Sequence, residues 1–213
     1  MHVSDVMSTN VVTIPGHTSL AEARRILDAH GFRRLPVVDR GRLVGIVTKD
    51  ALDRSGPSQL TTFSIHELSY LLHKLTVEKA MNRNVVTVSP STTVEEAVSL
   101  AQSKKVGSLL VMEDGRLVGI VTTNDFFYKI LNPILGIGMT GQRIAVHGCR
   151  QGNDIEKVIA AINRLGVEIK SLNMVRFQEE QEQDLTLHLR AGDLAPVIEE
   201  IKQMGYTVEE IAR

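Results

Sequence analysis

The sequence predicts an α+β protein in two parts: two copies of a small mixed unit, followed by a C-terminal unit with a different order of elements. The first observation is an internal repeat, since Gly41–Thr48 recurs letter for letter as Gly115–Thr122, 74 residues later. Aligned at this offset, residues 3–50 match residues 77–124 at 19 of 48 positions, which indicates a duplication. The second observation is that the hydrophobic pattern of the C-terminal third does not repeat the first two units.

Composition allows a well-formed core and argues against a nucleic-acid partner. The chain has 213 residues, of which 43% are hydrophobic, enough for one large domain or two small ones. Its 24 Lys and Arg residues nearly balance its 25 Asp and Glu residues. The chain therefore lacks the basic field that dominates binding to phosphate backbones.

The cysteine count and the N-terminus indicate a cytoplasmic protein. Cys149 is the single cysteine, so it has neither a disulfide partner nor a second thiolate for zinc. Met1–Asp5 lacks the basic and apolar character of a signal peptide, and no apolar stretch approaches the ~20 residues that span a bilayer. We expect a soluble, cytoplasmic protein without a membrane partner.

Each repeat has the predicted order β-α-β-β-α. A short β-rich run, Val11–Ile14 in the first copy and Val85–Val88 in the second, precedes a proline and a Ser/Thr cluster. A helix follows, and then a strand and the repeated octamer, whose glycine turn, apolar run and final Thr predict a hairpin, a buried strand and a helix cap. Two such units can pack pseudo-symmetrically. The apolar positions at helical spacing are Leu20, Ala23, Ile26 and Leu27 in the first copy and Val94, Ala97, Val98 and Ala101 in the second.

Between the copies, residues 65–75 predict a helix that docks on the repeats. Ser64 and Glu67 have the spacing of a capping box, and apolar residues then recur with the helical period. His66 and His73 on this helix suggest a metal pair. A solvated or half-buried helix face is the simpler interpretation, because no third ligand is near.

A glycine-rich segment follows the second repeat. Asp125–Leu131 predicts a helix that Asn132-Pro133 should stop. Gly136–Gly141 then fits the GxGxxG dinucleotide pattern, but that pattern needs a strand before it and a helix after it. Here a helix precedes and a strand-like run, Arg143–Val146, follows, so we interpret the segment as a flexible linker, with phosphate binding as the alternative.

The C-terminal unit has the predicted order βαββαβ. Apolar residues at helical spacing predict two helices, and alternating leucines predict a strand that returns after a charged turn. This order is a ferredoxin-like plan that folds as one small domain. The elements are strand Gln142–Val146, a helix ending at Gly166, a strand from about Val167 to Phe177, the turn Gln178–Gln183, a strand with Leu185, Leu187 and Leu189, a helix capped by Asp193, and strand Tyr206–Ile211.

The repeated unit resembles the CBS domain, and the two copies resemble a CBS pair (Bateman module). The C-terminal unit resembles an ACT domain, and the whole arrangement is similar to the acetoin utilisation protein AcuB family. The residues that carry the CBS resemblance are the two Val-Val-Thr runs, Arg33–Val38, Leu43–Thr48 and Leu117–Asp125. The implied boundaries are 1–54 for the first repeat, 55–75 for a linker with the docked helix, 76–131 for the second repeat, 132–141 for a Gly-rich linker and 142–213 for the ACT-like domain.

A nucleotide site is predicted around Thr122 and Asp125. A Thr at a strand-to-helix junction puts a hydroxyl and backbone N–H groups where a phosphate can sit, and Asp125 can accept two ribose hydroxyl protons. The same Thr-x-x-Asp spacing also fits a capping box without a ligand. Arg33 and Arg34 suit phosphate, although two arginines beside an apolar strand also fit a solvated rim. The CBS resemblance implies a main adenosine-nucleotide site formed by Val11, Val12, Arg33, Arg34, Ile120, Thr122, Asn124 and Asp125.

The second site implied by the resemblance departs from the pattern. Ala51 stands where the other repeat has Asp125, and Gly107 and Ser108 replace the two arginines. Asp50 lies one residue early, which turns its side chain about 100° around a helix. We therefore expect one competent and one degenerate site per chain. The residues of the degenerate site are Thr48, Asp50, Val85 and Val86.

An effector site in the C-terminal unit is implied only by the ACT resemblance. In ACT domains an amino acid binds between subunits, at the loop after the first strand and at the glycine that ends the first helix, here His147–Asp154 and Gly166. The implied contacts are Asn153, Asp154 and Gly166, but the usual Asp-x-Pro-Gly is absent. His147 and Cys149 could form a nucleophile pair; no orienting acid is identifiable, which favours structural or merely exposed roles.

The predicted function is regulatory and non-catalytic. The CBS pair would bind an adenosine-containing ligand (AMP, ADP, ATP, NAD or S-adenosylmethionine) as its regulatory ligand, with no catalytic cofactor and no metal, and closure of the cleft would change contacts with an unknown regulated protein. The ACT-like unit would dimerise or bind a second effector, and its exposed edge strands favour a homodimer. The alternatives are an oligomerisation module without a ligand and an enzyme of nucleotide metabolism, against which stands the lack of a catalytic motif.

Overall fold

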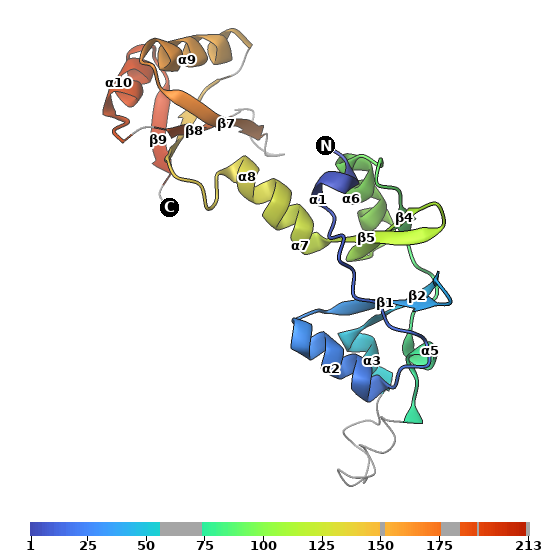
Figure 1. Ribbon diagram of the computed structural model, residues 1–213. Helices are drawn as coiled ribbons and strands as arrows, with labels where there is room; N and C mark the ends of the chain where they lie inside the picture. Colours follow the sequence, from blue (N-terminus) through green and yellow to red (C-terminus); the bar gives the residue numbers. More distant parts are fainter. Residues whose placement is uncertain (56–73, 150–151, 176–183, 191, 212–213) are drawn as a thin grey trace. The chain divides into compact units, whose positions relative to one another are not determined.

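The computed structural model describes residues 1–55, 74–149, 152–175, 184–190 and 192–211, and the chain divides into two compact units (Figure 1). The first unit is Met1–Phe126 and the second is Phe127–Arg213. The predicted capping box, residues 65–73 of the predicted helix with His66 and His73, and the turn Gln178–Gln183 lie outside the described residues. Among the helices in the described ranges, none has the length and apolar character needed to cross a membrane.

The first repeat is a hairpin packed with two helices around one core. Helix α2 (Leu20–His30) begins after Ser19, whose Oγ accepts the Glu22 N–H at 3.2 Å. Strands β1 (Arg34–Asp39) and β2 (Arg42–Thr48) pair antiparallel, and α3 (Lys49–Ser55) follows β2 directly. The predicted first strand is reduced to a bridge between Ile14 and Val37. A short helix, α1 (Val3–Val6), begins this repeat in the chain.

The second repeat has the same order of elements. It begins with α5 (Val77–Ala80), and β3 (Thr87–Val88) runs parallel to β4 (Ser108–Glu113). Helix α6 (Val94–Ser103) lies between these strands in the chain and is capped by Thr93, whose Oγ1 accepts the Glu96 N–H at 3.2 Å. Strand β5 (Arg116–Thr122) pairs antiparallel with β4 and leads into α7 (Thr123–Phe126). The β-α-β-β-α order predicted for each copy is thus present in this one, with a two-residue first strand.

Both hairpins turn on two residues with positive φ. The pair is Arg40 (φ 50°) and Gly41 (φ 77°) in the first repeat, and Asp114 (φ 48°) and Gly115 (φ 73°) in the second. Two consecutive residues of this kind form the turn whose twist matches the flanking strands. The first Gly of the octamer is therefore required by the turn.

Each repeat pairs with the chain segment that leads into the other. The Ser8 N–H donates to the Ile120 carbonyl at 2.9 Å, and the Ile120 N–H donates back to Ser8 at 3.0 Å. The segment before the second repeat pairs with β2 in the same way, through Asn82 and Ile46 at 2.8 and 2.9 Å. These two stretches, Met7–Ser8 and Met81–Asn82, are called the lead segments below. Because they are exchanged, the repeats are interlocked.

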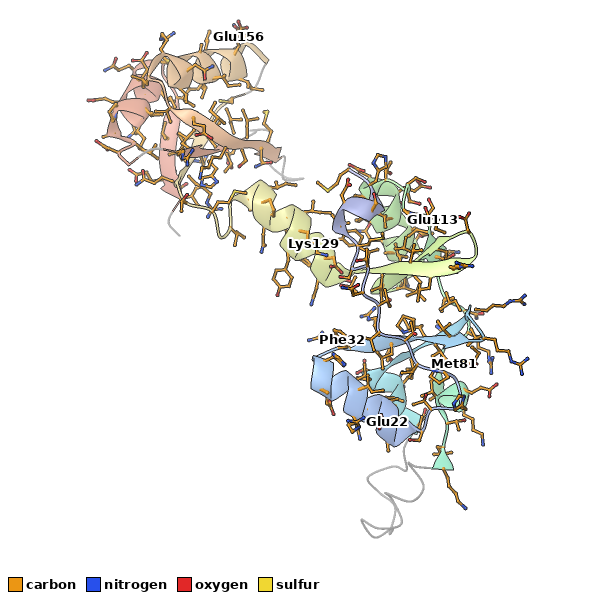
Figure 2. The ribbon with its side chains drawn as sticks, in the orientation of Figure 1. Glu22, Phe32, Met81, Glu113, Lys129 and Glu156 are labelled. Carbon is orange, nitrogen blue, oxygen red and sulfur yellow. The ribbon has the colours of Figure 1, made fainter. Side chains whose placement is uncertain are left out.

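The second Gly of each octamer makes room for a methionine of a lead segment. A Cβ built on Gly45 would lie 2.7 Å from Met81 Sδ and 3.0 Å from the Asn82 carbonyl oxygen. A Cβ on Gly119 would lie 2.5 Å from Met7 Sδ. Favourable carbon contacts begin near ~3.5 Å, so both methionines need a glycine opposite them. Figure 2 labels Met81 within this first unit.

The prediction that Asn132-Pro133 ends the helix after β5 is wrong. A π-helix, η1 (Phe127–Leu131), follows α7 and leads into α8 (Asn132–Leu135), which has Pro133 in its first turn. Proline is tolerated there because its missing N–H removes no essential hydrogen bond. The helical run ends at Gly136, which is left-handed (φ 68°) and donates its N–H to Pro133 O at 3.1 Å.

The second unit contains a four-stranded antiparallel sheet in the order β7-β8-β6-β9. One face of the sheet buries Ile144, Val146 and three leucines against both helices. The Ala195 N–H donates to Asp193 Oδ1 at 2.9 Å, while the N-cap position itself is Leu194. The elements are β6 (Gln142–His147), α9 (Gly152–Arg164), β7 (Glu168–Val175), β8 (Asp184–Arg190), α10 (Ala195–Gln203) and β9 (Thr207–Ile211).

The C-terminal end of α8 is held by polar side chains of this sheet. Arg143 Nη1 donates to the Leu135 carbonyl at 2.6 Å. Asn173 Nδ2 and Ser171 Oγ donate to the Ile134 carbonyl at 2.7 and 3.2 Å. The last carbonyls of a helix have no partner within the helix, so the sheet supplies the donors that α8 lacks.

Candidate functional site

A cavity of about 380 Å³ lies in the first unit and is lined by both repeats. This volume falls within the ~300–1,000 Å³ of typical small-molecule sites. Thr48, Val85 and Val86, three of the four residues predicted for the degenerate site, come together in its wall, whereas Asp50 is exposed and does not line it. The polar lining residues are Arg34, Thr48, Arg54, Asn82, Asn84 and Ser108, and the others are Ile46, Ala51, Ala80, Met81, Val85, Val86, Val106, Gly107 and Leu110.

Thr48 caps the helix that follows β2. Its Oγ1 accepts the Ala51 N–H at 3.1 Å, as predicted for the last residue of the octamer. Ala51 itself lines the cavity and presents only a methyl group to it. The hydroxyl at this strand end is thus a hydrogen-bond acceptor.

The matching strand end in the second repeat uses the same positions differently. Asp125 Oδ2 accepts the Thr122 N–H at 2.8 Å and the Thr122 hydroxyl at 2.6 Å. The carboxylate therefore reaches back to the strand end, which is one half of the capping box allowed by the Thr-x-x-Asp spacing. Asp125 is half-buried.

Arg34 lies across the first unit against Gly107 of the other repeat. A Cβ built on Gly107 would lie 3.1 Å from both Arg34 Nη1 and Nη2, and Arg34 lines the cavity at Thr48. Burial lowers the pKa of Arg34, the Arg33 guanidinium lowers it further, and Asp50 opposes this shift. Gly107 therefore leaves the space that the guanidinium occupies.

The other residues predicted for the main site are placed around β5 and the first lead segment. Ile120 pairs with Ser8, which lies just before Val11 in the chain. Val11 and Val12 are half-buried, and Val12 packs on the core of the first repeat. Asn124 and Arg33 are exposed. Four of the predicted residues lie together at the end of β5: Ile120, Thr122, Asn124 and Asp125. Arg34 instead lines the cavity at the end of β2.

The predicted effector residues of the second unit do not meet within one chain. Asn153 lies in the first turn of α9 and Gly166 just beyond its end, about 20 Å apart along the helix axis. Asp154 accepts the Tyr206 hydroxyl at 2.9 Å. Burial, followed by this hydrogen bond, raises the pKa of Tyr206 to about 12.

Cys149 and His147 do not form a nucleophile pair. Cys149 is fully buried, and burial raises the pKa of its thiol to about 11, so the reactive thiolate is scarce at neutral pH. His147 Nδ1 lies 2.8 Å from Asp184 Oδ1, and its Nε2 lies 3.5 Å from Glu209 Oε2. The hydrogen bond with Asp184 raises the pKa of His147. This acid was missed because Asp184 is 37 residues away in the chain.

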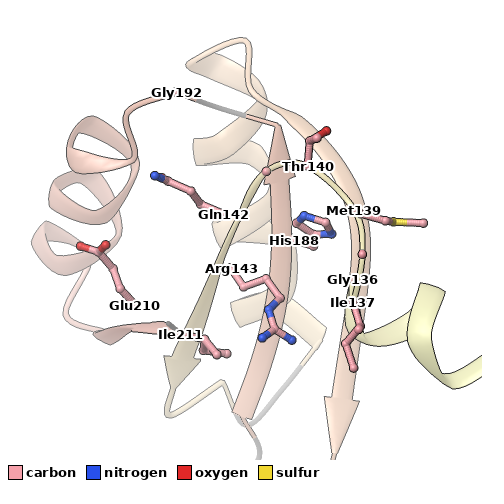
Figure 3. Close-up of a pocket in the computed structure, with 12 residues that line it drawn as sticks. Gly136, Ile137, Met139, Thr140, Gln142, Arg143, His188, Gly192, Glu210 and Ile211 are labelled. Carbon is pink, nitrogen blue, oxygen red and sulfur yellow. The ribbon is translucent and has the colours of Figure 1, made fainter. Parts of the chain in front are cut away.

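A larger cavity, of about 930 Å³, lies in the second unit where Gly136–Gly141 passes beside His188 (Figure 3). A Cβ on Gly136 would collide with the His188 ring, and one on Gly141 would lie 2.7 Å from His188 Nε2. As predicted, a helix precedes this segment and a strand follows it. Two glycines of the GxGxxG pattern are thus explained by contact with a buried histidine.

No three or more His, Cys, Asp or Glu side chains in the described ranges could together hold a metal ion.

The interlocked repeats, with a cavity lined by both, define a tandem-repeat module of small-molecule-binding dimensions. The model of the CBS domain family matches residues 3–55 and 77–132, so the chain belongs to the CBS domain family. The two matches coincide with the two repeats, and the first unit is therefore a CBS pair.

Similar proteins include both a small CBS protein and large enzymes. A CBS domain-containing protein of Dictyostelium discoideum is 34% identical over 137 residues, covering 62% of this chain and 94% of that protein. The inosine-5′-monophosphate dehydrogenase of Korarchaeum cryptofilum is 33% identical over 126 residues, covering 58% of this chain but only 23% of the enzyme. The chain thus spans under a quarter of that enzyme's length.

Two solved structures are similar over the same share of the chain. The Vibrio cholerae protein described as an acetoin utilization protein (AcuB) is 28% identical, with a TM-score of 0.52, covering 62% of this chain and 91% of that one. CBSX2, solved in complex with AMP, is 29% identical, with a TM-score of 0.50, covering 62% of this chain and 97% of that one.

Proposed function

We propose that this protein is a non-catalytic regulatory protein whose CBS pair binds an adenosine-containing ligand. The observation that carries the proposal is the cavity of about 380 Å³ lined by both interlocked repeats. A ligand that fills it contacts both repeats and so favours one arrangement of them over others. The complex of the similar protein CBSX2 with AMP supports an adenosine ligand. AMP, ADP, ATP, NAD and S-adenosylmethionine are the candidates.

The main site of the proposal is at the matching strand end of the second repeat, where Asp125 is held against Thr122. Asp125 Oδ2 accepts two hydrogen bonds from Thr122, which hold the carboxylate in place. A carboxylate held in this way is a preorganised acceptor for ribose hydroxyls. In this proposal Val11 and Val12 contact the base, and Ile120, Asn124 and Arg33 complete the site.

A regulatory role fits the range of proteins that contain a similar segment. The matched region makes up 23% of the homoserine O-acetyltransferase of Methanohalobium evestigatum and 22% of the L-aspartate semialdehyde sulfurtransferase of Methanocaldococcus jannaschii. These enzymes catalyse unrelated reactions, so the shared segment supplies something other than the chemistry. Control by a small molecule is a function that such different enzymes can share.

For the second unit we propose an ACT-like domain of ferredoxin-like plan that forms a homodimer or binds a second effector. The β-α-β-β-α-β order and the strand order β7-β8-β6-β9 support it. Strands β7 and β9 are the sheet edges among the described strands, and unpaired edges favour association with another copy. With the CBS pair, this arrangement supports a protein like those of the AcuB family.

Calorimetric titration of the full chain tests the nucleotide site. AMP, ATP, NAD and S-adenosylmethionine would be titrated into the wild type, Asp125→Ala and Asp125→Asn. Both variants are expected to weaken binding at this site by about tenfold or more, because each removes a charge-assisted hydrogen bond to ribose. Asp125→Asn keeps an acceptor for Thr122, which separates ligand binding from folding.

Glu113→Ala is the matched control, since it removes an exposed carboxylate from the same repeat. Unchanged binding in Asp125→Ala would refute the ribose assignment. A wild type that binds no adenosine ligand would support a purely structural module. Turnover of the bound nucleotide during prolonged incubation would support an enzyme instead.

A further inference from the structure

The charged side chains that line the cavity at the end of β2 are all positive. Arg34 and Arg54 line it, and no Asp or Glu does so among the described residues. Within those residues, neither guanidinium has an ion pair or a hydrogen bond to a carboxylate, whereas nearby Lys49 pairs with Asp28 at 2.6 Å. Arginine stays protonated at neutral pH, so two cations face this cavity, and the charge of Asp50 acts on Arg34 without an ion pair or a hydrogen bond.

Arg34 is held at the wall of the cavity by the packing of the other repeat. It is half-buried, and its guanidinium occupies the space left by the missing side chain of Gly107. Ser108, beside that glycine, adds a hydroxyl to the lining. Burying a guanidinium without an ion pair costs free energy, even when the burial is partial. An anionic group bound in the cavity would offset this cost.

The same cavity lacks a group that recognises ribose. Ala51 stands where the second repeat has Asp125, and the Thr48 hydroxyl accepts the Ala51 N–H. Ile46, Val85 and Val86 still provide an apolar surface on which a base can pack. The lining therefore suits a ligand with an apolar ring and a strongly negative end.

We propose that this cavity selects adenosine ligands by phosphate charge, so that ATP and ADP bind more tightly than AMP. It discriminates against neutral 5′-methylthioadenosine and against S-adenosylmethionine, which carries a cationic sulfonium. The inference rests on the proposed function and names the ligand class of one of its two sites. The cavity expected to be degenerate is then a second site with a different selectivity.

Calorimetry on the full chain tests this proposal with variants that remove or keep the positive charge of the cavity. They are made in the Asp125→Ala background, so that the cavity is the remaining site. Arg34→Gln/Arg54→Gln is expected to weaken ATP binding by about tenfold or more and to leave 5′-methylthioadenosine unchanged, because charged hydrogen bonds are lost only for phosphate. Arg34→Lys keeps the charge and should retain most of the affinity. Ala51→Asp should weaken ATP binding. It should leave the affinity for 5′-methylthioadenosine unchanged or increase it.

The control is Arg42→Gln/Arg116→Gln, which removes two exposed arginines outside the cavity lining. It should leave ATP affinity within about twofold of its parent. Equal affinity for ATP and 5′-methylthioadenosine, or ATP binding that is insensitive to Arg34→Gln/Arg54→Gln in folded protein, overturns the inference while leaving the proposed function standing. A wild type that binds no adenosine ligand overturns both.

Discussion

The hydrogen bonds at the two octamer ends differ because of one residue. Thr48 accepts the Ala51 N–H, whereas Thr122 donates its hydroxyl to Asp125. The preceding strands are identical in sequence, so the change follows from the side chain three positions on. Exchange of a methyl for a carboxylate reverses the role of the threonine and changes the local charge by one unit.

Gly45→Ala is expected to destabilise the protein by about 1–3 kcal/mol. Its added methyl would meet Met81 Sδ at 2.7 Å and the Asn82 carbonyl oxygen at 3.0 Å, and the backbone oxygen cannot swing away. The control is Gly152→Ala, whose methyl would meet no atom within 4 Å. Urea unfolding measures both, and equal free energies of unfolding for the two variants would contradict the packing role.

Single residues were predictable from the sequence where their partners are local. The cap at Thr48 and the contact of Asp125 with Thr122 both span three residues, so spacing alone indicates them. The position of the Arg34 guanidinium depends on the absence of a side chain at Gly107, in the other repeat. A long side chain has many rotamers, and nothing in its own neighbourhood selects this one.

Among the elements, α8 shows how partners distant in the chain override a local stop signal. Pro133 predicts an ending, yet the helix continues through it to Leu135. Arg143, Asn173 and Ser171 then satisfy its last carbonyls from two strands of the sheet. The sequence pattern that predicts β6 and β7 says nothing about these polar contacts, which come from residues between the apolar ones.

The contact of His147 with β8 and β9 should make the second unit more stable at acidic pH. Asp184, and then Glu209, hold the pKa of folded His147 above its usual value. This stability is fully present below the unfolded pKa of ~6.5 and is lost as pH rises through the folded pKa. His147→Gln should remove it, at most about 1 kcal/mol for a partly exposed pair.

Thermal unfolding of wild type and His147→Gln from about pH 5.5 to 8.5 measures this difference. The two proteins should differ at the acidic end and converge at the alkaline end. His30→Gln is the control, because His30 stacks on Phe32 with ring centroids 5.1 Å apart and makes no ion pair with a carboxylate among the described residues. A difference that grew with pH would contradict the assignment.

At the scale of the whole molecule, the order of elements was predictable but the exchange of lead segments was not. Duplication and hydrophobic periodicity indicate β-α-β-β-α units because each signal lies within one repeat. Ser8 pairs with β5, and Asn82 with β2, although each segment is nearer in the chain to the other hairpin. Both pairings satisfy the same backbone groups, so the sequence pattern does not distinguish them.

The exchange predicts that mutations in one lead segment loosen the other repeat. Met7→Ala removes the side chain that packs on Gly119, at an expected cost of about 1–2 kcal/mol for a half-buried methionine. Amide hydrogen exchange should then accelerate at Ile120 more than at Ile46. Met81→Ala should show the reverse. Faster hydrogen exchange only in the repeat that the mutated segment leads into would contradict the pairing of each lead segment with the other repeat.

The same connection sets a condition on biosynthesis. Ser8 is synthesised well before its partner Ile120, which lies near the end of the CBS pair. At ~5–20 residues per second, the first lead segment waits on the order of ten seconds for β5 to leave the ribosome. Until then Met7 and its neighbours have no native strand to join, so this segment of the nascent chain depends longest on protection from aggregation.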